Sequence, residues 1–534
     1  MKSPFFFVTL AVALAILGLG VWKGTFAAAD GDAYGYVSEA DLLAKGSLRV
    51  EQQFVRTMPW PFADWSFAPA GYRPATVRGF IVPIYPPGLP LVMAVFQRAA
   101  GAGAVFYVVP LMGALCVWMT GKLAARVHGK LTGVMAACLL ASSPSFLFQL
   151  MQPVSDVPAT AWWTMSLALA VRGSGRASLG AGLAASMAVL TRPNLVPLAA
   201  VVGGFFSCAI IARTDAGSRS GAVQRLALFI AGAVPGCLAV AAVQHYLYGS
   251  PLRSGYEEFD ALFAWANARP NLDRYPRWLI ETQTPIVCLA VAAPWLTRTR
   301  STKTAAPPMR ADHVWLLLAF VAVVFLSYLF YIPFGRGEWS YLRFLLPAYP
   351  PLLILSAAVA LETIRRIIAD DRVRLTASIL LLAVLAGWQG REAFRRGAFM
   401  QQLVERRYVD VGRYIAAQTP SNAVFITGVE AGSIRYYSGR PTIRYDWIGE
   451  RRLNQVVEVM REKGYHPYIA LEEAEEPRFR DRFERLSELA RLDWPPAAQR
   501  SQPIRVRIYD PLDRDRIAAG GVVATADIGA ARIP

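Results

Sequence analysis

The sequence predicts a mostly α-helical protein that spans a membrane many times and ends in a small soluble α/β domain. Hydrophobic residues make up 54% of the 534 residues and charged residues only 17%, whereas a soluble globular chain has about 25% charged residues. Residues 313–334, 342–361 and 375–387 are nearly free of charge, while residues 391–534 are rich in Arg, Asp and Glu. The chain therefore combines segments suited to lipid with a tail suited to water.

Apolar stretches and basic loops together predict about eleven membrane spans. Short cytoplasmic loops are enriched in Lys and Arg, and every second stretch ends in such a loop, for example at Arg126 and Lys130 or at Arg365 and Arg366. This pattern places the N-terminus in the cytoplasm and the C-terminal tail outside. The predicted spans are residues 4–28, 103–125, 131–150, 157–171, 177–191, 194–212, 226–247, 277–296, 313–333, 343–361 and 375–390.

The N-terminal stretch has two interpretations. The apolar run from Pro4 to Trp22 is followed by Ala27-Ala28-Ala29, which resembles a signal peptide with its small-residue cleavage site. The run is longer than an ordinary signal core, however, and about 19 residues are enough to cross the bilayer. We therefore expect a retained first span, and in both interpretations Asp30 lies outside.

The sequence divides into a membrane domain, residues 1–390, and a C-terminal extracytoplasmic domain, residues 391–534. The membrane domain includes a long external loop, residues 29–102. In the tail, strand-like apolar runs alternate with helical patterns, which is typical of a small α/β layer structure. Strands are expected at 423–427, 441–446, 468–470 and 504–509, and helices at 402–418, 430–437, 448–463 and 476–490.

Several function classes are disfavoured by composition and motifs. The net charge of +17 does not indicate nucleic acid, because many of the basic residues lie between apolar runs rather than on one soluble face. The cysteines all fall in apolar stretches and form no CxxC pattern, so neither a disulfide framework nor a cysteine metal site is expected. No G-x-x-x-x-G-K-[ST] motif is present, which disfavours an ATP-driven transporter.

Four carboxylates lie within residues 30–41, directly after the first predicted span: Asp30, Asp32, Glu39 and Asp41. A carboxylate at the membrane surface can act as a general base or hold a divalent cation near a lipid phosphate. The alternative is a solvated loop, since acids in loops usually have no further role.

Asp156 lies in a short external turn, after Ser155 and before Pro158. Either Ser155 or Asp156 suits the N-cap of the next helix, because proline is tolerated in the first turn. A helix N-terminus also favours anions, so capping and ligand binding are both open for this turn.

The segment from Tyr85 to Pro90, Tyr-Pro-Pro-Gly-Leu-Pro, predicts a rigid corner. Its three prolines fix φ and remove backbone donors, so an uninterrupted helix is excluded. Residues 89–99 after this corner suit a short helix that lies at the membrane interface and roofs a cavity.

Two arginines interrupt apolar sequence near predicted outer span ends. Arg192 precedes Pro193 and Asn194, and a lone arginine there must snorkel to water or meet an anion; snorkelling is the commoner case. Arg343 poses the same choice, and here we favour phosphate binding because a guanidinium fits phosphate bidentately.

These motifs, in this order, resemble those of the GT-C superfamily of membrane glycosyltransferases, which includes protein O-mannosyltransferases and the lipid A aminoarabinose transferase. Each motif alone is weak, and their order over nearly the whole chain carries the resemblance. The matching segments are Asp32–Tyr36, Tyr85–Pro90, Ser155–Pro158, Arg192–Asn194 and Leu342–Pro347, with Gly432–Pro441 similar to the soluble domain of bacterial members.

The resemblance implies an inverting transfer of a sugar from a polyprenyl-phosphate donor at the outer face of a bacterial inner or plasma membrane. Asp32 would deprotonate or orient the acceptor hydroxyl, and Arg343 would stabilise the departing phosphate. Asp156, Arg192, Tyr36 and Tyr85 are the further substrate-binding candidates that the matching segments supply. A divalent metal ion held by Asp32 and Asp156 is an open possibility, since some relatives work without metal.

The expected partners are the lipid-linked sugar, membrane lipids, and an envelope glycan, lipid or protein as acceptor, with no nucleic acid. Two other functions fit the same architecture. A transporter or flippase of lipid-linked sugars would need charged or broken helices near the bilayer midplane, and most candidate polar residues lie at external span ends instead. A non-catalytic membrane assembly protein is the second alternative.

Overall fold

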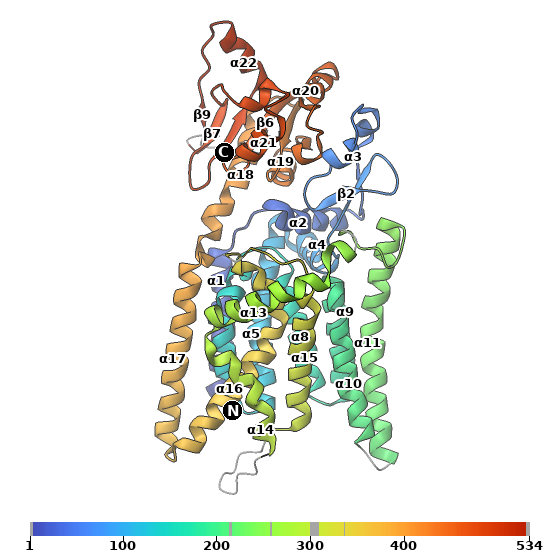
Figure 1. Cartoon of the computed structure of the whole chain (residues 1–534). Coiled ribbons are helices and arrows are strands. Elements are labelled where there is room, and N and C mark those ends of the chain that lie inside the picture. Colours follow the sequence, from blue (N-terminus) through green and yellow to red (C-terminus); the bar gives the residue numbers. More distant parts are fainter. Residues whose placement is uncertain (1–3, 213–215, 257–258, 299–308, 336, 530–534) are drawn as a thin grey trace.

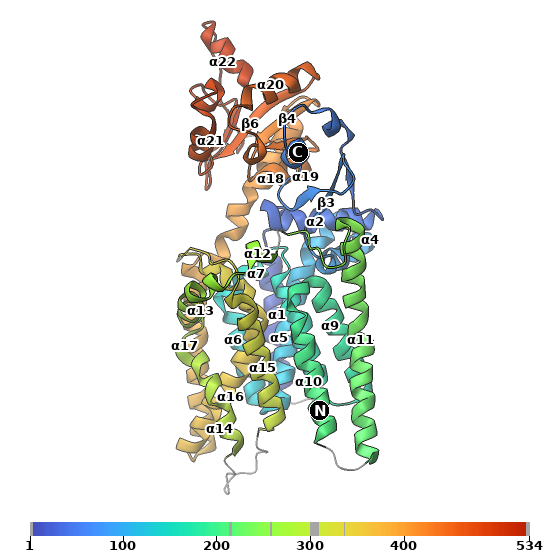
Figure 2. The same ribbon diagram turned by 45° about the vertical axis from the view of Figure 1, so that its right-hand side comes forward.

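The computed structural model describes residues 4–212, 216–256, 259–298, 309–335 and 337–529. Figure 1 shows three layers, a lower bundle of long helices, an upper domain built on a β-sheet, and a cap between them that contains α2, α4 and β2. Figure 2 shows the same cap from another side, with β3 and α2 directly below the upper domain. Helix α1 starts in the lower half of the molecule, and the C-terminal elements lie at the upper end.

The bundle makes the chain an integral, multi-pass membrane protein. Seven described helices are long and apolar enough to cross a bilayer, and an eighth span forms if α6 and α7, bent by 62° at Ser143, count as one. The count of about eleven spans stays a prediction. The candidates are α1 (Pro4–Lys23), α5 (Val108–Val127), α10 (Pro197–Ile211), α11 (Ala216–Tyr248), α15 (Ala311–Leu329), α16 (Tyr349–Ile367) and α17 (Asp371–Arg395), and the bent pair is α6 (Lys130–Ser142) with α7 (Pro144–Leu150).

Three predicted spans correspond to shorter or broken elements. Helices α8 (Asp156–Ala170) and α9 (Gly175–Thr191) have 15 and 17 residues, and α8 is mostly buried inside the bundle. Gly182 of α9 and Gly232 of α11 let these two helices approach closely, because a Cβ at either glycine would overlap the backbone of the other helix. The predicted span 277–296 is not continuous: it is broken at Thr284, between α13 (Ala268–Gln283) and the 3₁₀ segment Pro285–Ala292, which leads into α14 (Ala293–Arg298).

The cap corrects the prediction of an open acidic loop. Residues Asp30–Ala44 form helix α2, and just over half of its residues are buried. The corner after Tyr85 leads directly into helix α4 (Gly88–Ala100), which confirms the short helix expected there. The remaining cap elements are α3 (Ala63–Ser66) and a small antiparallel sheet in the order β1 (Val50–Glu51), β3 (Phe80–Pro83), β2 (Tyr72–Pro74); the short helix α12 (Phe259–Leu262) precedes α13.

The upper domain contains a six-stranded sheet in the order β5-β4-β6-β8-β7-β9. Strand β4 pairs in parallel with β5 and β6, and β8 runs antiparallel to β6. The strand predicted at 423–427 is confirmed by β4, whereas the short β7 and β9 were not predicted. The elements are α18 (Gln401–Gln418), β4 (Ala423–Thr427), α19 (Ala431–Ser438), β5 (Thr442–Arg444), α20 (Leu453–Glu462), β6 (His466–Glu472), α21 (Glu476–Phe483), β7 (Ala498–Arg500), β8 (Val506–Tyr509), α22 (Pro511–Ala518) and β9 (Ala526–Asp527).

The cap and the upper domain share one hydrophobic core. Trp60 and Phe67 of the cap are buried in the same cluster as Ile426 of β4. Helix α19 lies against α2 at Gly432, where a Cβ would come within 2.4 Å of the Tyr34 ring. The division at residue 390 stays a prediction, since the external segment packs with the C-terminal residues.

Candidate functional site

Asp32 is held by two of the predicted site residues. It lies in the first turn of α2, where one carboxylate oxygen accepts the Tyr85 hydroxyl at 2.6 Å and the other accepts Nη2 of Arg343 at 2.7 Å. The Asp32 side chain is 34% exposed and the Arg343 side chain 22%. This ion pair is therefore open to water and to a ligand.

The sequence explains how Tyr85 reaches Asp32 across the cap. Gly35, one turn after Gly31 on α2, has no Cβ, and a Cβ there would lie 2.2 Å from the Tyr85 ring. Gly88 likewise lets the start of α4 approach the end of α9, because a Cβ at Gly88 would lie 2.4 Å from the backbone nitrogen of Thr191. These two glycines bring the proline corner against both α2 and α9.

Asp156 and Arg192 form a second ion pair, which is buried. Asp156 lies in the first turn of α8 and accepts Nη2 of Arg192 at 2.5 Å, and their side chains are 1% and 10% exposed. The hydroxyl of Ser155 accepts Nε of Arg192 at 3.3 Å and the hydroxyl of Tyr36 at 2.8 Å. Ser155 occupies the N-cap position of α8, as one of the two expected alternatives, but its side chain makes no capping hydrogen bond. The expectation that Arg192 snorkels to water is wrong, because its guanidinium has buried polar partners inside the fold.

The two ion pairs belong to one cluster. Tyr36 and Asp32 lie one turn apart on α2, and the Tyr36 and Tyr85 ring centroids are 4.6 Å apart. The Phe344 ring lies 5.6 Å from the guanidinium of Arg192 and 5.3 Å from that of Arg343. All six predicted site residues thus meet where the cap joins the bundle. We call them the six-residue cluster: Asp32, Tyr36, Tyr85, Asp156, Arg192 and Arg343.

Each arginine of the cluster keeps a donor without an acceptor among the described residues. Nε of Arg343 and Nη1 of Arg192 are both buried and have no hydrogen-bond partner there. A buried charged donor left unsatisfied is costly. Oxygen atoms of a bound anion would satisfy both donors, and a phosphate carries enough oxygens to do so.

The environment of Asp32 keeps it ionised at neutral pH. Burial favours the neutral acid, but the Arg343 guanidinium and the hydrogen bond from Tyr85 outweigh this and hold the pKa of Asp32 below its ordinary value of 3.8. Burial and the nearby Asp32 charge raise the pKa of Tyr85 well above its ordinary value, so Tyr85 stays a hydrogen-bond donor. Asp32 is thus a carboxylate that can accept a proton.

The donor set does not fit a divalent metal ion. Asp32 and Asp156 each already face a guanidinium, which opposes a second cation at the same oxygens. Among the described residues no group of three His, Cys, Asp or Glu side chains is arranged to hold a metal.

Three neighbours of the cluster were not among the predicted site residues. Ser155 was assigned only as a possible cap, and Phe344 only as part of a motif, yet both contact the cluster arginines. Tyr256, from the segment before α12, places its ring 6.0 Å from Tyr85. The sequence signal for Ser155 and Phe344 is their position next to Asp156 and Arg343, whereas no sequence signal marks Tyr256.

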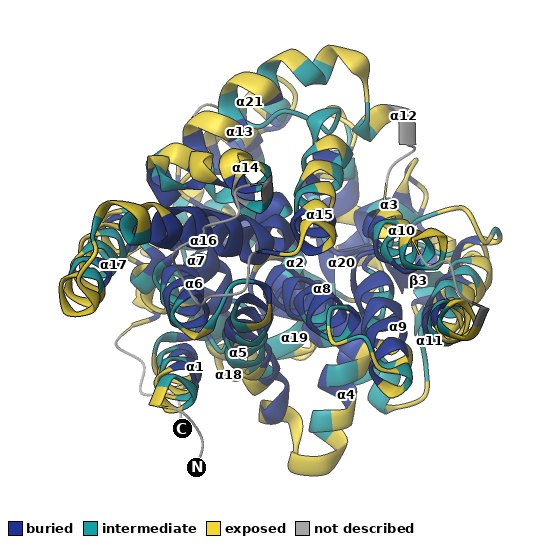
Figure 3. Ribbon diagram, turned by 90° about the horizontal axis from the view of Figure 1, so that it is seen from below, coloured by how far each residue is buried: buried dark blue, intermediate teal, exposed yellow. Residues whose placement is uncertain are grey.

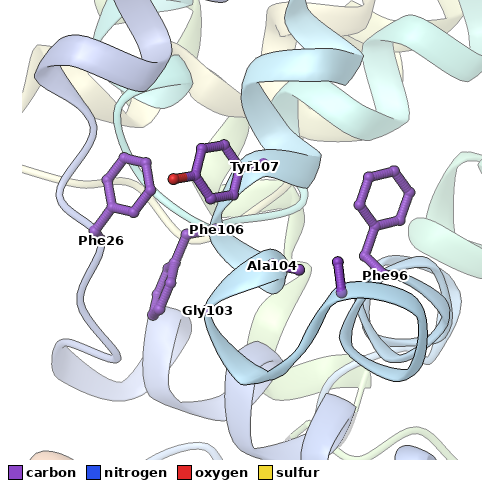
Figure 4. Close-up of a pocket in the computed structure, with 7 residues that line it drawn as sticks. Phe26, Phe96, Gly103, Ala104, Phe106 and Tyr107 are labelled. Carbon is purple, nitrogen blue, oxygen red and sulfur yellow. The ribbon is translucent and has the colours of Figure 1, made fainter.

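A groove of about 610 Å³ lies beside the cap, between the chain after α1, the end of α4 and the segment before α5. Figure 4 shows the rings of Phe26, Phe96, Phe106 and Tyr107 around it. Its lining is largely aromatic and apolar, which suits a hydrocarbon chain.

No model of a known protein family matches the chain, and no curated protein matches it either. Solved structures do match. ArnT from Cupriavidus metallidurans bound to undecaprenyl phosphate superimposes with a TM-score of 0.55 at 14% identity, over 94% of this chain and 97% of ArnT. The chain has the GT-C fold.

Two further GT-C structures agree with this. Oligosaccharyltransferase AglB from Archaeoglobus fulgidus, in complex with an inhibitory peptide and a dolichol-phosphate, matches with a TM-score of 0.53 at 12% identity, over 90% of this chain and 72% of AglB. Arabinofuranosyltransferase AftD from Mycobacteria matches with a TM-score of 0.50 at 14% identity, over 87% of this chain but only 35% of AftD. The resemblance stated from sequence is confirmed at the level of the GT-C fold.

Proposed function

We propose that the chain is a membrane glycosyltransferase that moves a sugar from a polyprenyl-phosphate donor to an envelope glycan, lipid or protein. The observation that carries this proposal is the six-residue cluster, in which an ionised carboxylate lies 2.7 Å from a guanidinium with a free buried donor. A proton acceptor and a phosphate-binding group side by side are what sugar transfer from a lipid phosphate requires.

The proposed reaction inverts the anomeric carbon. The acceptor hydroxyl gives its proton to the Asp32 carboxylate while its oxygen bonds to the anomeric carbon. The bond between that carbon and the phosphate oxygen breaks, and the phosphate leaves with the electron pair. Arg343 stabilises this developing charge, because a charge-assisted hydrogen bond strengthens as the oxyanion forms.

The other cluster residues position these two. Tyr85 fixes the orientation of Asp32 through its 2.6 Å hydrogen bond. The buried Asp156 holds Arg192, whose Nη1 is a second candidate donor for the phosphate. Tyr36 connects α2 to this pair through Ser155. The aromatic groove beside the cap is suited to an apolar chain of the donor or of a lipid acceptor.

The proposed orientation puts the cluster and residues 391–534 outside the cell and the N-terminus in the cytoplasm of a bacterial inner or plasma membrane. The basic loops between predicted spans support this orientation. The acceptor would then approach the partly exposed Asp32–Arg343 pair from the outer side of the membrane.

The proposal is tested by incubating the purified chain with a panel of polyprenyl-phosphate sugars and an envelope extract. We expect release of polyprenyl phosphate from one donor, detected by mass spectrometry, and transfer of its sugar to an acceptor in the extract. A flippase would instead move the intact donor across a vesicle bilayer without cleavage. Donor movement with no cleavage of any donor would contradict the proposal and favour the flippase.

The transfer rate should stay nearly constant from neutral to mildly acidic pH and fall only in strong acid. Asp32 acts as the base in its ionised form, and its pKa lies below 3.8, so the active form is lost only when the pH falls through that low pKa. Initial rates measured with circular dichroism as a control for folding would check this. An acidic limb centred above about pH 5 contradicts it, because ordinary carboxyls titrate near pH 4.

A further inference from the structure

A smaller pocket, lined by several charged residues, lies at the end of the bundle opposite the six-residue cluster. It has a volume of about 280 Å³ and lies where α5, α6, α16 and α17 end or begin. Figure 3 shows these four helices grouped on one side of the molecule, seen from below. Its charged lining residues are Lys130, Arg365, Arg374, Glu362 and Asp371, together with His128.

We propose that this pocket binds the phosphate headgroup of an anionic phospholipid. The N-terminal turn of α6 forms part of the wall, through Lys130, Leu131 and Thr132. The residue before this helix is Gly129, which offers no side-chain cap to the first backbone N–H groups. Uncapped N–H groups and the positive end of the helix dipole both favour an anion.

The lysine and arginine side chains of the pocket outnumber its carboxylates. Glu362 is shared by Arg365 at 2.6 Å, Arg366 at 3.1 Å and His128 at 4.0 Å, so a single carboxylate serves three basic groups. Arg374 pairs with Asp371, but its Nε is buried without an acceptor among the described residues. Lys130 forms no ion pair with any of the described residues. A phosphate would supply the missing negative charge and acceptor oxygens.

The position of the pocket identifies the anion as a lipid headgroup. It lies at the ends of two candidate spans, α5 and α16, and at the start of a third, α17, which is the level of the headgroups. Leu375 both lines the pocket and is exposed, and the apolar side chains of Ile379, Leu380 and Val384 continue the exposed surface along α17. Acyl chains can lie on this face while the headgroup occupies the pocket.

The test is native mass spectrometry of the full chain with dioleoylphosphatidylglycerol or dioleoylphosphatidylcholine. We expect the wild type to retain phosphatidylglycerol preferentially. The double variant Lys130→Gln/Arg374→Gln should bind phosphatidylglycerol roughly 25-fold more weakly, because each of these two cations would contact the headgroup phosphate in the pocket and strengthen its binding by roughly fivefold. Arg372→Gln, on the same turn of α17 but outside the pocket lining, is the matched control and should bind as the wild type does.

Three results would overturn the proposal. Equal retention of both lipids by the wild type removes the selectivity for an anionic headgroup. An equal loss in Arg372→Gln and in the double variant shows a diffuse charge effect rather than a pocket. Displacement of phosphatidylglycerol by an equal concentration of inorganic phosphate assigns the pocket to a soluble anion. The unfolding temperature of each variant in detergent checks that the comparison is between folded proteins, and the result is independent of the proposed transferase activity.

Discussion

Replacing Asp32 with asparagine should lower the rate of polyprenyl-phosphate release by roughly 10³-fold, within the range for loss of a general base. Asparagine preserves the shape of the side chain and can still accept the Tyr85 hydroxyl, but it takes no proton from the acceptor. The same change removes the charge that faces Arg343 at 2.7 Å, so Arg343 remains available to a phosphate. We therefore expect the turnover rate to fall while the affinity for the lipid phosphate is kept or increased.

This split between turnover and affinity distinguishes a catalytic residue from a structural one. The matched control is Asp312→Asn, which removes the carboxylate of another aspartate–arginine pair, to Arg310 at 2.6 Å, at the start of α15. That variant should keep full turnover. If Asp32→Asn folds normally and retains more than a tenth of the wild-type rate, Asp32 is not the base.

Replacing Asp156 with alanine should destabilise the bundle by about 3–5 kcal/mol, since it leaves a buried guanidinium without its partner. Asp156 is 1% exposed and Arg192 10%, so water cannot replace the lost carboxylate. The change also frees Ser155 and Tyr36 from their arrangement around Arg192. We expect a large drop in the thermal unfolding midpoint together with loss of transfer activity.

Two further variants separate stability from function at this pair. The double change Asp156→Leu/Arg192→Met removes both charges and should recover most of the stability, because apolar residues can replace a buried ion pair at little cost. Transfer activity should not return, since the second phosphate donor is gone. Asp64→Ala, which breaks the exposed pair with Arg78, should cost less than about 1 kcal/mol. A destabilisation by Asp156→Ala no larger than that of Asp64→Ala would contradict the structural role.

Residue pattern was sufficient to predict the helical membrane architecture and several elements of the upper domain. Strand β4 was predicted at its observed bounds because Ala423–Thr427 is a buried apolar run between turn residues. Strands β7 and β9 have three and two residues, too few for any alternation to stand out. The break at Thr284 was missed, although the polar residues Glu281–Gln283 precede it and Pro285, which cannot donate a helical hydrogen bond, follows it.

The six predicted site residues were selected because they lie in the segments that resemble the GT-C superfamily, and the two aspartates and two arginines among them also because charged side chains at predicted outer span ends are few. Their pairing could not be predicted, since Asp32 meets Arg343 and Asp156 meets Arg192 only through the packing of α2, α8, α9 and the 3₁₀ segment Trp339–Ala348 that carries Arg343. Helix α2 was interpreted as a loop because Gly31, Gly35 and Asp32 have poor helix propensity. Packing against α4 and α19 overrides that propensity.

The core shared by Phe67 and Tyr509 has a consequence for synthesis of the chain. Translation proceeds at about 5–20 residues per second, so the first partner emerges long before the second, with a delay on the order of a minute at the slower rate. During this interval Trp60 and Phe67 lack their partners from the upper domain and are open to aggregation or to a chaperone. The cap that carries Asp32 is therefore fully packed only after the last strands of the upper domain have been synthesised.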